Sequence, residues 1–123
     1  MATDQLREHG ALARGAFAVT VLVSFAVLFA PPADVPASPP GVDKLIHFTL
    51  FAVLAATGRW AGIARRALAT GLVLYAGGSE LLQGTDLVNR DASVGDLLAD
   101  SAGVVAGLLL WRLIASRRDR TRR

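Results

Sequence analysis

The chain has 123 residues, of which 53% are hydrophobic and 19% are charged; its mean hydropathy is +0.46 and its formal net charge is +3. Soluble domains usually carry more charge and less apolar content, so this composition points to a lipid bilayer and excludes a disordered protein. The chain contains no cysteine, which excludes disulfide scaffolds, thiolate metal centres and cysteine nucleophiles.

Four apolar blocks follow one another along the chain, and each approaches the length of a membrane-spanning helix once its flanks are included. A span needs about 17–25 mostly apolar residues. Four core helices of a soluble protein would leave almost no polar surface. The sequence therefore predicts an all-α fold, an integral membrane four-helix bundle with spans at residues 15–30, 42–60, 63–83 and 97–115.

The segments between the apolar blocks have the composition of loops. All five prolines lie between residues 31 and 40, which predicts an extended connection. Residues 84–95 are rich in Asp, Asn, Ser and Gly, as is typical of turns. A competing interpretation makes the first block a signal peptide cleaved near Val35-Pro36-Ala37, which would leave three spans in an unchanged orientation.

Arginine and lysine in the short loops predict how the spans are oriented. The 59–66 connection carries three arginines and the last seven residues carry five, whereas the two other loops carry only Lys44 and Arg90. We therefore expect a multi-pass protein of the cell membrane with both termini cytoplasmic. The predicted organisation is a cytoplasmic N-terminal segment, a four-span membrane domain and a basic cytoplasmic tail, at residues 1–14, 15–115 and 116–123.

The basic tail suggests a partner. Five of its eight residues are arginines, and a run of this kind directly after a span typically binds anionic cytoplasmic lipid. Nucleic acid is not expected as a partner, because the run has no interleaved aromatic residues and belongs to no recognition fold.

Polar and ionisable side chains gather at the predicted outer ends of the second, third and fourth spans. Each ionisable group costs about 2.5–3.5 kcal/mol at a helix centre, and such groups are usually functional. Three helices would thus present polar groups at one depth on one side of the membrane, which random polar substitution would not be expected to produce. The candidate ligand-binding residues are Asp43, Lys44, His47, Glu80, Gln83, Arg90, Asp96 and Asp100.

Helical spacing predicts which of these side chains face the bundle interior. Asp96 and Asp100 are four residues apart and share a helix face. The same stripe continues through Gly103 and Gly107, a pair of small residues that lets two helices approach closely. Asp100 is therefore expected to face inward. The pair Gly77–Gly78 is expected to allow close packing of the third span in the same way.

Some candidates also have ordinary structural interpretations. Asp43 fits a helix cap, and Asp96 fits the end of a capping box that begins at Ser93. Lys44 fits a side chain that extends to the head groups, and Arg90 fits a counter-charge for the acids around it.

The remaining ionisable candidates, His47, Glu80 and Asp100, lie inside apolar runs. That position favours a function. The alternative is a buried histidine–carboxylate pair that only locks the helices together.

Three short motifs contain most of the candidates. They read D-K-L-I-H-F at residues 43–48, S-E-L-L-Q at 79–83 and, after Arg90, D-L-L-A-D-S-A-G at 96–103. In order and spacing they resemble the D-K-x-x-H-F and S-E-x-x-Q segments of the VanZ-like family, and its arginine followed by D-x-x-x-N-x-x-G. The resemblance extends over residues 15–115. Asp100 departs from the asparagine that is frequent in the family, and it adds an acid.

The resemblance implies a small multi-pass membrane protein of a bacterial cell envelope. The founding member of the family is linked to low-level resistance to teicoplanin-type glycopeptides, so an effect on glycopeptide susceptibility is one expectation for this chain. The molecular activity of most members is unknown.

Three functions are open at this point. In the first, the outer-face site binds or acts on a cell-envelope lipid or a lipid-linked glycan of cell-wall synthesis, with Lys44, His47 and Arg90 as donors. In the second, the protein is a membrane-embedded enzyme that uses His47 and Glu80 as acid and base, or holds a divalent cation. In the third, it is a structural scaffold without a ligand. The sequence has no metal-ligand signature, so no metal, cofactor or catalytic residue is assigned.

Overall fold

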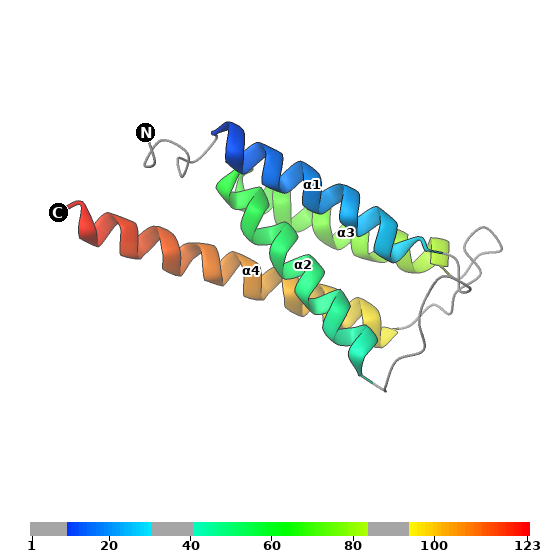
Figure 1. Cartoon of the computed structure of the whole chain (residues 1–123). Helices are drawn as coiled ribbons and strands as arrows, with labels where there is room; N and C mark the ends of the chain where they lie inside the picture. Colours follow the sequence, from blue (N-terminus) through cyan, green and yellow to red (C-terminus); the bar gives the residue numbers. More distant parts are fainter. Residues whose placement is uncertain (1–9, 31–40, 84–93) are drawn as a thin grey trace.

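The computed structural model describes residues 10–30, 41–83 and 94–123, and every regular element among them is a helix. The helices are α1 (Ala11–Leu28), α2 (Val42–Trp60), α3 (Arg65–Gln83) and α4 (Val94–Thr121). Successive helices run in opposite directions, so the start of α1 and the end of α4 lie at the same end of the molecule (Figure 1). The predicted all-α fold with four helices is confirmed for these residues.

The helix bounds follow the predicted spans closely in the middle of the chain and less closely at its ends. The second span, 42–60, coincides with α2, and the third begins two residues before α3. The fourth helix is longer than predicted, because it runs from Val94 to Thr121. The predicted basic tail is therefore mostly a helical continuation of α4. The Pro-rich connection and the cleavage site suggested for it lie outside the described residues.

A tight turn joins α2 to α3. Gly62 has φ 94°, the left-handed conformation that ends many helices. Its N–H donates to the carbonyl of Arg59, and the N–H of Ile63 donates to the carbonyl of Gly58. These two bonds form a Schellman motif, which satisfies the last carbonyls of α2. The Arg59 guanidinium also donates to the carbonyl of Ile63 across 2.8 Å and fixes the turn.

The closest helix pair is α2 with α4, which cross at an angle in the middle of the bundle (Figure 1). A Cβ on Gly103 would collide with the backbone oxygen of Phe48, and a Cβ on Gly107 would collide with that of Ala52. Only glycine leaves room for this backbone contact, so the predicted role of the Gly103 and Gly107 stripe is confirmed.

The second pair of glycines behaves differently. A Cβ on Gly77 or Gly78 would meet no described atom within 4 Å, so the expectation that these residues allow close helix packing is wrong. The reason is the register of α3, whose buried face carries Leu72, Ala76 and Ser79 and turns the two glycines to its side. The close approach involving α3 occurs instead at Gly58 of α2, where a Cβ would lie 2.7 Å from Leu68 Cδ1.

Hydrogen bonds and aromatic contacts attach α1 to the other helices. Ser24 is fully buried, and its hydroxyl lies 2.8 Å from the hydroxyl of Tyr75 on α3. The Tyr75 ring packs edge-to-face on Phe25 and at a tilt on Phe51 of α2. Aromatic pairs of this kind contribute about 0.5–1.5 kcal/mol beyond the area they bury.

Apolar side chains occur on the surface of the bundle as well as in its core. Large apolar side chains such as Leu22, Leu74 and Leu113 are more than half exposed, whereas His47 and Asp100 are almost fully buried. By length and composition, two of the described helices, α1 and α4, are apolar enough to cross a membrane.

Candidate functional site

A buried histidine–carboxylate pair lies where α2 crosses α4. The distance between His47 Nδ1 and Asp100 Oδ1 is 2.7 Å, a short hydrogen bond in which a ring N–H donates to the carboxylate oxygen. His47 is 1% exposed and Asp100 is fully buried. Gly103 lies one turn beyond Asp100 and brings the two helices close enough for this bond. Asp100 thus faces the interior, as predicted.

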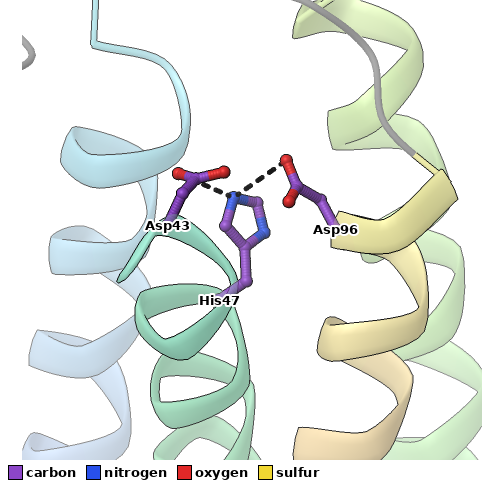
Figure 2. A group of neighbouring side chains, drawn as sticks. All are labelled: Asp43, His47 and Asp96. Carbon is purple, nitrogen blue, oxygen red and sulfur yellow. Dashed lines mark ion pairs between the residues drawn. The ribbon is translucent and has the colours of Figure 1, made fainter. Parts of the chain in front are cut away.

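Two further carboxylates face the other ring nitrogen of His47 (Figure 2). The distance from His47 Nε2 to Asp43 Oδ1 is 3.9 Å, and that to Asp96 Oδ2 is 3.8 Å. Both exceed the range of a hydrogen bond, so these are ion-pair distances. The Asp96 side chain is 7% exposed and that of Asp43 is 45% exposed. The site therefore opens toward the surface on the Asp43 side.

Lys44 adds one positive charge at the edge of the cluster. Its Nζ lies 3.6 Å from Asp96 Oδ1, the oxygen that is not paired with His47. The Lys44 side chain is 53% exposed. This ion pair joins the start of α2 to the start of α4 and leaves the half-exposed lysine within reach of a ligand that approaches from the surface.

A third helix contributes a carboxylate at the same level. Glu80 lies near the end of α3 and is 6% exposed. One ligand atom from each of His47, Glu80 and Asp100 falls within 4.8 Å of the others. The structure thus brings together the predicted polar groups of three helices at one end of the bundle. We call Asp43, His47, Glu80, Asp96 and Asp100 the acidic cluster.

Gln83 makes its hydrogen bond outside the acidic cluster. Its Nε2 donates to the backbone oxygen of Leu28 across 2.7 Å, and both residues are buried. Leu28 ends α1, and the last carbonyls of a helix need partners from outside the helix. Gln83 therefore ties the end of α3 to the end of α1, a contact between residues that are 55 positions apart in the sequence.

We expect the substitution Gln83→Leu to lower the free energy of unfolding by about 1–3 kcal/mol, the usual cost of losing a buried hydrogen bond. Ligand binding by the folded variant should stay unchanged. Chemical unfolding in detergent micelles, followed by circular dichroism, measures the effect, with Leu81→Ala as a control at a 76% exposed position. Equal stabilities of the Gln83 and Leu81 variants would contradict the structural role.

Two sequence interpretations concern the helix starts. Gly41, with φ 89°, stands at the N-cap of α2, and Asp43 lies in the first turn instead of capping the helix. A carboxylate there still interacts favourably with the helix dipole. The capping box suggested for Asp96 involves Ser93, which lies outside the described residues, as does the candidate Arg90.

The described part of the site is rich in acceptors and poor in donors. Its four carboxylates face one imidazole and one ammonium group, so a cation or a ligand with several hydroxyl groups would complement it. Ser79 and Ser101 donate their hydroxyls to the carbonyls of Ala76 and Leu97 in their own helices.

An apolar groove on the α1 side of α2 was not anticipated from the sequence. It runs between α1 and α2 and has a volume of about 490 Å³. Its α2 side includes Leu45, Thr49 and Val53, a stripe of residues four apart that begins directly after Lys44. This four-residue spacing is the feature of the sequence from which the groove could have been predicted. The groove is lined by Val19, Thr20, Val23, Leu45, Ile46, Thr49, Leu50 and Val53.

A basic cleft lies away from the acidic cluster, where the α2–α3 turn meets the second half of α4. It has a volume of about 430 Å³ and collects Arg59, Arg65 and Arg112 from three helices, together with Asp119. Arg59 and Arg65 belong to the 59–66 connection, whose arginines were used to predict the orientation of the spans. The sequence did not indicate that Arg112 lies beside them.

Comparisons of the chain with protein-family models, with curated proteins and with solved structures each find no match. The resemblance to the VanZ-like family accordingly stays a prediction that rests on the three motifs.

Proposed function

We propose that this chain is an integral membrane protein whose four helices cross the bilayer, with both termini in the cytoplasm. The exposed apolar surface and the two most apolar helices support insertion. The arginines of the basic cleft lie at the end of the bundle that also holds the start of α1 and the end of α4, the pattern expected of a cytoplasmic face. The acidic cluster is then at the outer face.

Within that arrangement, the function is to bind the polar head group of a cell-envelope lipid or lipid-linked glycan. The observation that carries this proposal is that α2 contributes both to the buried, charged cluster, which it forms with α4, and to the apolar groove, which it forms with α1. Lys44 pairs with a phosphate of the head group and the carboxylates accept hydrogen bonds from its hydroxyls, while the groove that includes Leu45 holds an acyl chain. Basic residues of the tail add contacts to anionic lipid on the cytoplasmic side.

Acid–base catalysis on the bound lipid is a second candidate, and one observation favours it. Asp100 orients the His47 ring through Nδ1, and Nε2 faces the open side of the site. A histidine held in this way is a suitable general base. The sequence suggested His47 and Glu80 as the acid–base pair. In this proposal Asp100 is the partner of His47, because Asp100 makes the short hydrogen bond to its ring.

Native mass spectrometry of the protein extracted from washed membranes tests the lipid proposal. We expect bound lipid with a phosphate or sugar head group on the unsubstituted chain. The variant Thr49→Trp fills the groove at an exposed position and should reduce lipid occupancy at least tenfold, in line with the dependence of affinity on pocket contacts. Lys44→Ala should do the same through the head group.

The matched control is Arg66→Ala, which removes an exposed positive charge at the other end of the bundle and should leave occupancy unchanged. Recovery of the chain in the soluble fraction would refute the membrane assignment. Lipid occupancy that is the same in all variants would refute the site.

A further inference from the structure

Three side chains of the acidic cluster surround a common point at its open side. Asp43 and Asp96 approach His47 Nε2 from two different helices (Figure 2), and the three ligand atoms all lie within 4.8 Å of one another. The two distances from Nε2, 3.9 Å and 3.8 Å, are too long for hydrogen bonds. Two groups bound to one transition-metal ion, each about 2.0–2.2 Å from it, lie about 3–4 Å apart. The observed separations fit that arrangement.

The opposite side of the imidazole supplies an independent observation. Histidines that bind a metal almost always donate their other ring N–H to a carboxylate or carbonyl, which fixes the ring and raises its basicity. Here Nδ1 donates to Asp100 Oδ1 across 2.7 Å. Asp100 is fully buried, and among the described residues its second oxygen, Oδ2, has no hydrogen-bond partner. A buried carboxylate in this position directs Nε2 toward Asp43 and Asp96.

We propose that His47 Nε2, Asp43 and Asp96 bind one divalent transition-metal ion, with Asp100 as the positioning residue. Lys44 pairs with Asp96 Oδ1, so that Oδ2 faces the ion. One imidazole and two carboxylates, with no cysteine, suit Zn²⁺ or Mn²⁺. Three protein ligands leave a coordination position open, as in catalytic and ligand-binding centres. This inference rests on the proposed function, since it names what the same site uses to hold the phosphate of a lipid head group.

The deeper group formed by His47, Glu80 and Asp100 is the competing location. Its ligand atoms are equally close. However, two of its members, His47 and Asp100, are already joined by the short hydrogen bond at Nδ1. The outer group uses the other nitrogen and keeps that bond, so the outer location is favoured.

Isothermal titration of the full chain in detergent micelles, after treatment with a chelator, tests the proposal with ZnCl₂ and MnCl₂. We expect one bound ion per chain and a higher Tm when metal is added. The substitutions Asp43→Asn and Asp96→Asn should each weaken binding at least tenfold. Asp43→Asn is the critical variant, because the Asp43 side chain is 45% exposed whereas that of Asp96 is 7% exposed. Asp119→Asn, at the far end of α4, is the matched control and should leave binding unchanged.

The positioning role of Asp100 has its own readout. Asp100→Asn should weaken binding about 10–100-fold. It should also shift the visible absorption band of bound Co²⁺, because the His47 ligand becomes less basic. A loss of folded protein alone would lower the amount of Co²⁺ bound without moving the band, and that result would overturn the role assigned to Asp100.

Three further outcomes distinguish the metal site from its alternatives. Binding that survives Asp43→Asn but is lost in Glu80→Gln would place the ion in the deeper group and overturn the inference. Absence of Zn²⁺ and Mn²⁺ binding by a chain that still carries lipid would overturn the metal site and leave the proposed function standing. Metal binding by a chain that carries no lipid in native mass spectrometry would support the metal site and refute the lipid proposal.

Discussion

The substitution Gly103→Ala should destabilise the protein, because it adds a methyl group where α2 and α4 are in backbone contact. A Cβ added to this glycine would collide with the backbone oxygen of Phe48. A clash with a side chain is relieved by a change of rotamer, but a clash with backbone is relieved only when the two helix axes move apart. We expect a loss of about 1–3 kcal/mol in the free energy of unfolding, the usual cost of overpacking, and a larger loss for Gly103→Leu.

The chain offers a matched control for this experiment. Gly77 is also a helical glycine, but a Cβ there would meet no described atom within 4 Å. The substitution Gly77→Ala should therefore stabilise the protein by roughly 0.5–1 kcal/mol, because alanine has the higher helix propensity. Chemical unfolding in micelles, followed by circular dichroism, gives both values. If the two substitutions shift the free energy of unfolding in the same direction, the close α2–α4 contact does not exist in solution.

The consequence of Gly103→Ala extends beyond stability. Separation of α2 from α4 moves His47 away from Asp100, because these residues lie on the two helices that the glycine holds together. We therefore expect the variant to lose metal and lipid binding even where it remains folded, while Gly77→Ala retains both.

The two glycine pairs also illustrate what could be predicted from the sequence. The stripe from Asp96 through Gly107 indicated one interacting face on α4, since each member follows the last by one helical turn. Gly77 and Gly78 are adjacent residues and form no such stripe, so their identity alone did not define a face. Register against the neighbouring helix decided their exposure, and register depends on side chains such as Leu72 and Ala76.

The same limit applies to the site. Helix periodicity and the alternating direction of the helices were enough to place His47, Glu80 and Asp100 at one end of the bundle. They were not enough to predict which residue each side chain contacts. Gln83 lies one turn from Glu80, but its amide reaches α1, because the end of that helix lies beside the end of α3. Contacts between residues 55 positions apart are fixed by helix packing, and local sequence patterns do not encode them.

The largest electrostatic effect is expected at the pair His47 and Asp100, which are nearly or fully buried. Removal of one partner leaves the other group buried without its counterpart. For a buried ion pair this costs about 3–5 kcal/mol, so His47→Leu and Asp100→Leu should each reduce the free energy of unfolding by that amount. Both single variants should accumulate poorly in membranes.

The double variant His47→Leu plus Asp100→Leu separates a packing role from a functional one. Replacing both members of a buried pair by apolar residues of similar size is often neutral or stabilising. We therefore expect the double variant to be more stable than either single variant and to reach nearly the abundance of the unsubstituted protein. A double variant as unstable as the sum of the single variants would show that the two residues do not interact.

Because the double variant is expected to fold, its lipid and metal binding distinguish a packing role of the pair from a ligand-binding role. If His47 and Asp100 only lock α2 to α4, then two leucines perform that task, and the folded variant keeps its lipid and every measurable phenotype. If the pair orients a ligand-binding imidazole, the folded variant loses metal binding and lipid occupancy together, because no nitrogen faces Asp43 and Asp96. We expect the second result. An apolar pair would lock two helices in a bilayer at lower cost than a buried charge, so a histidine and an aspartate in this position imply a use for their charge.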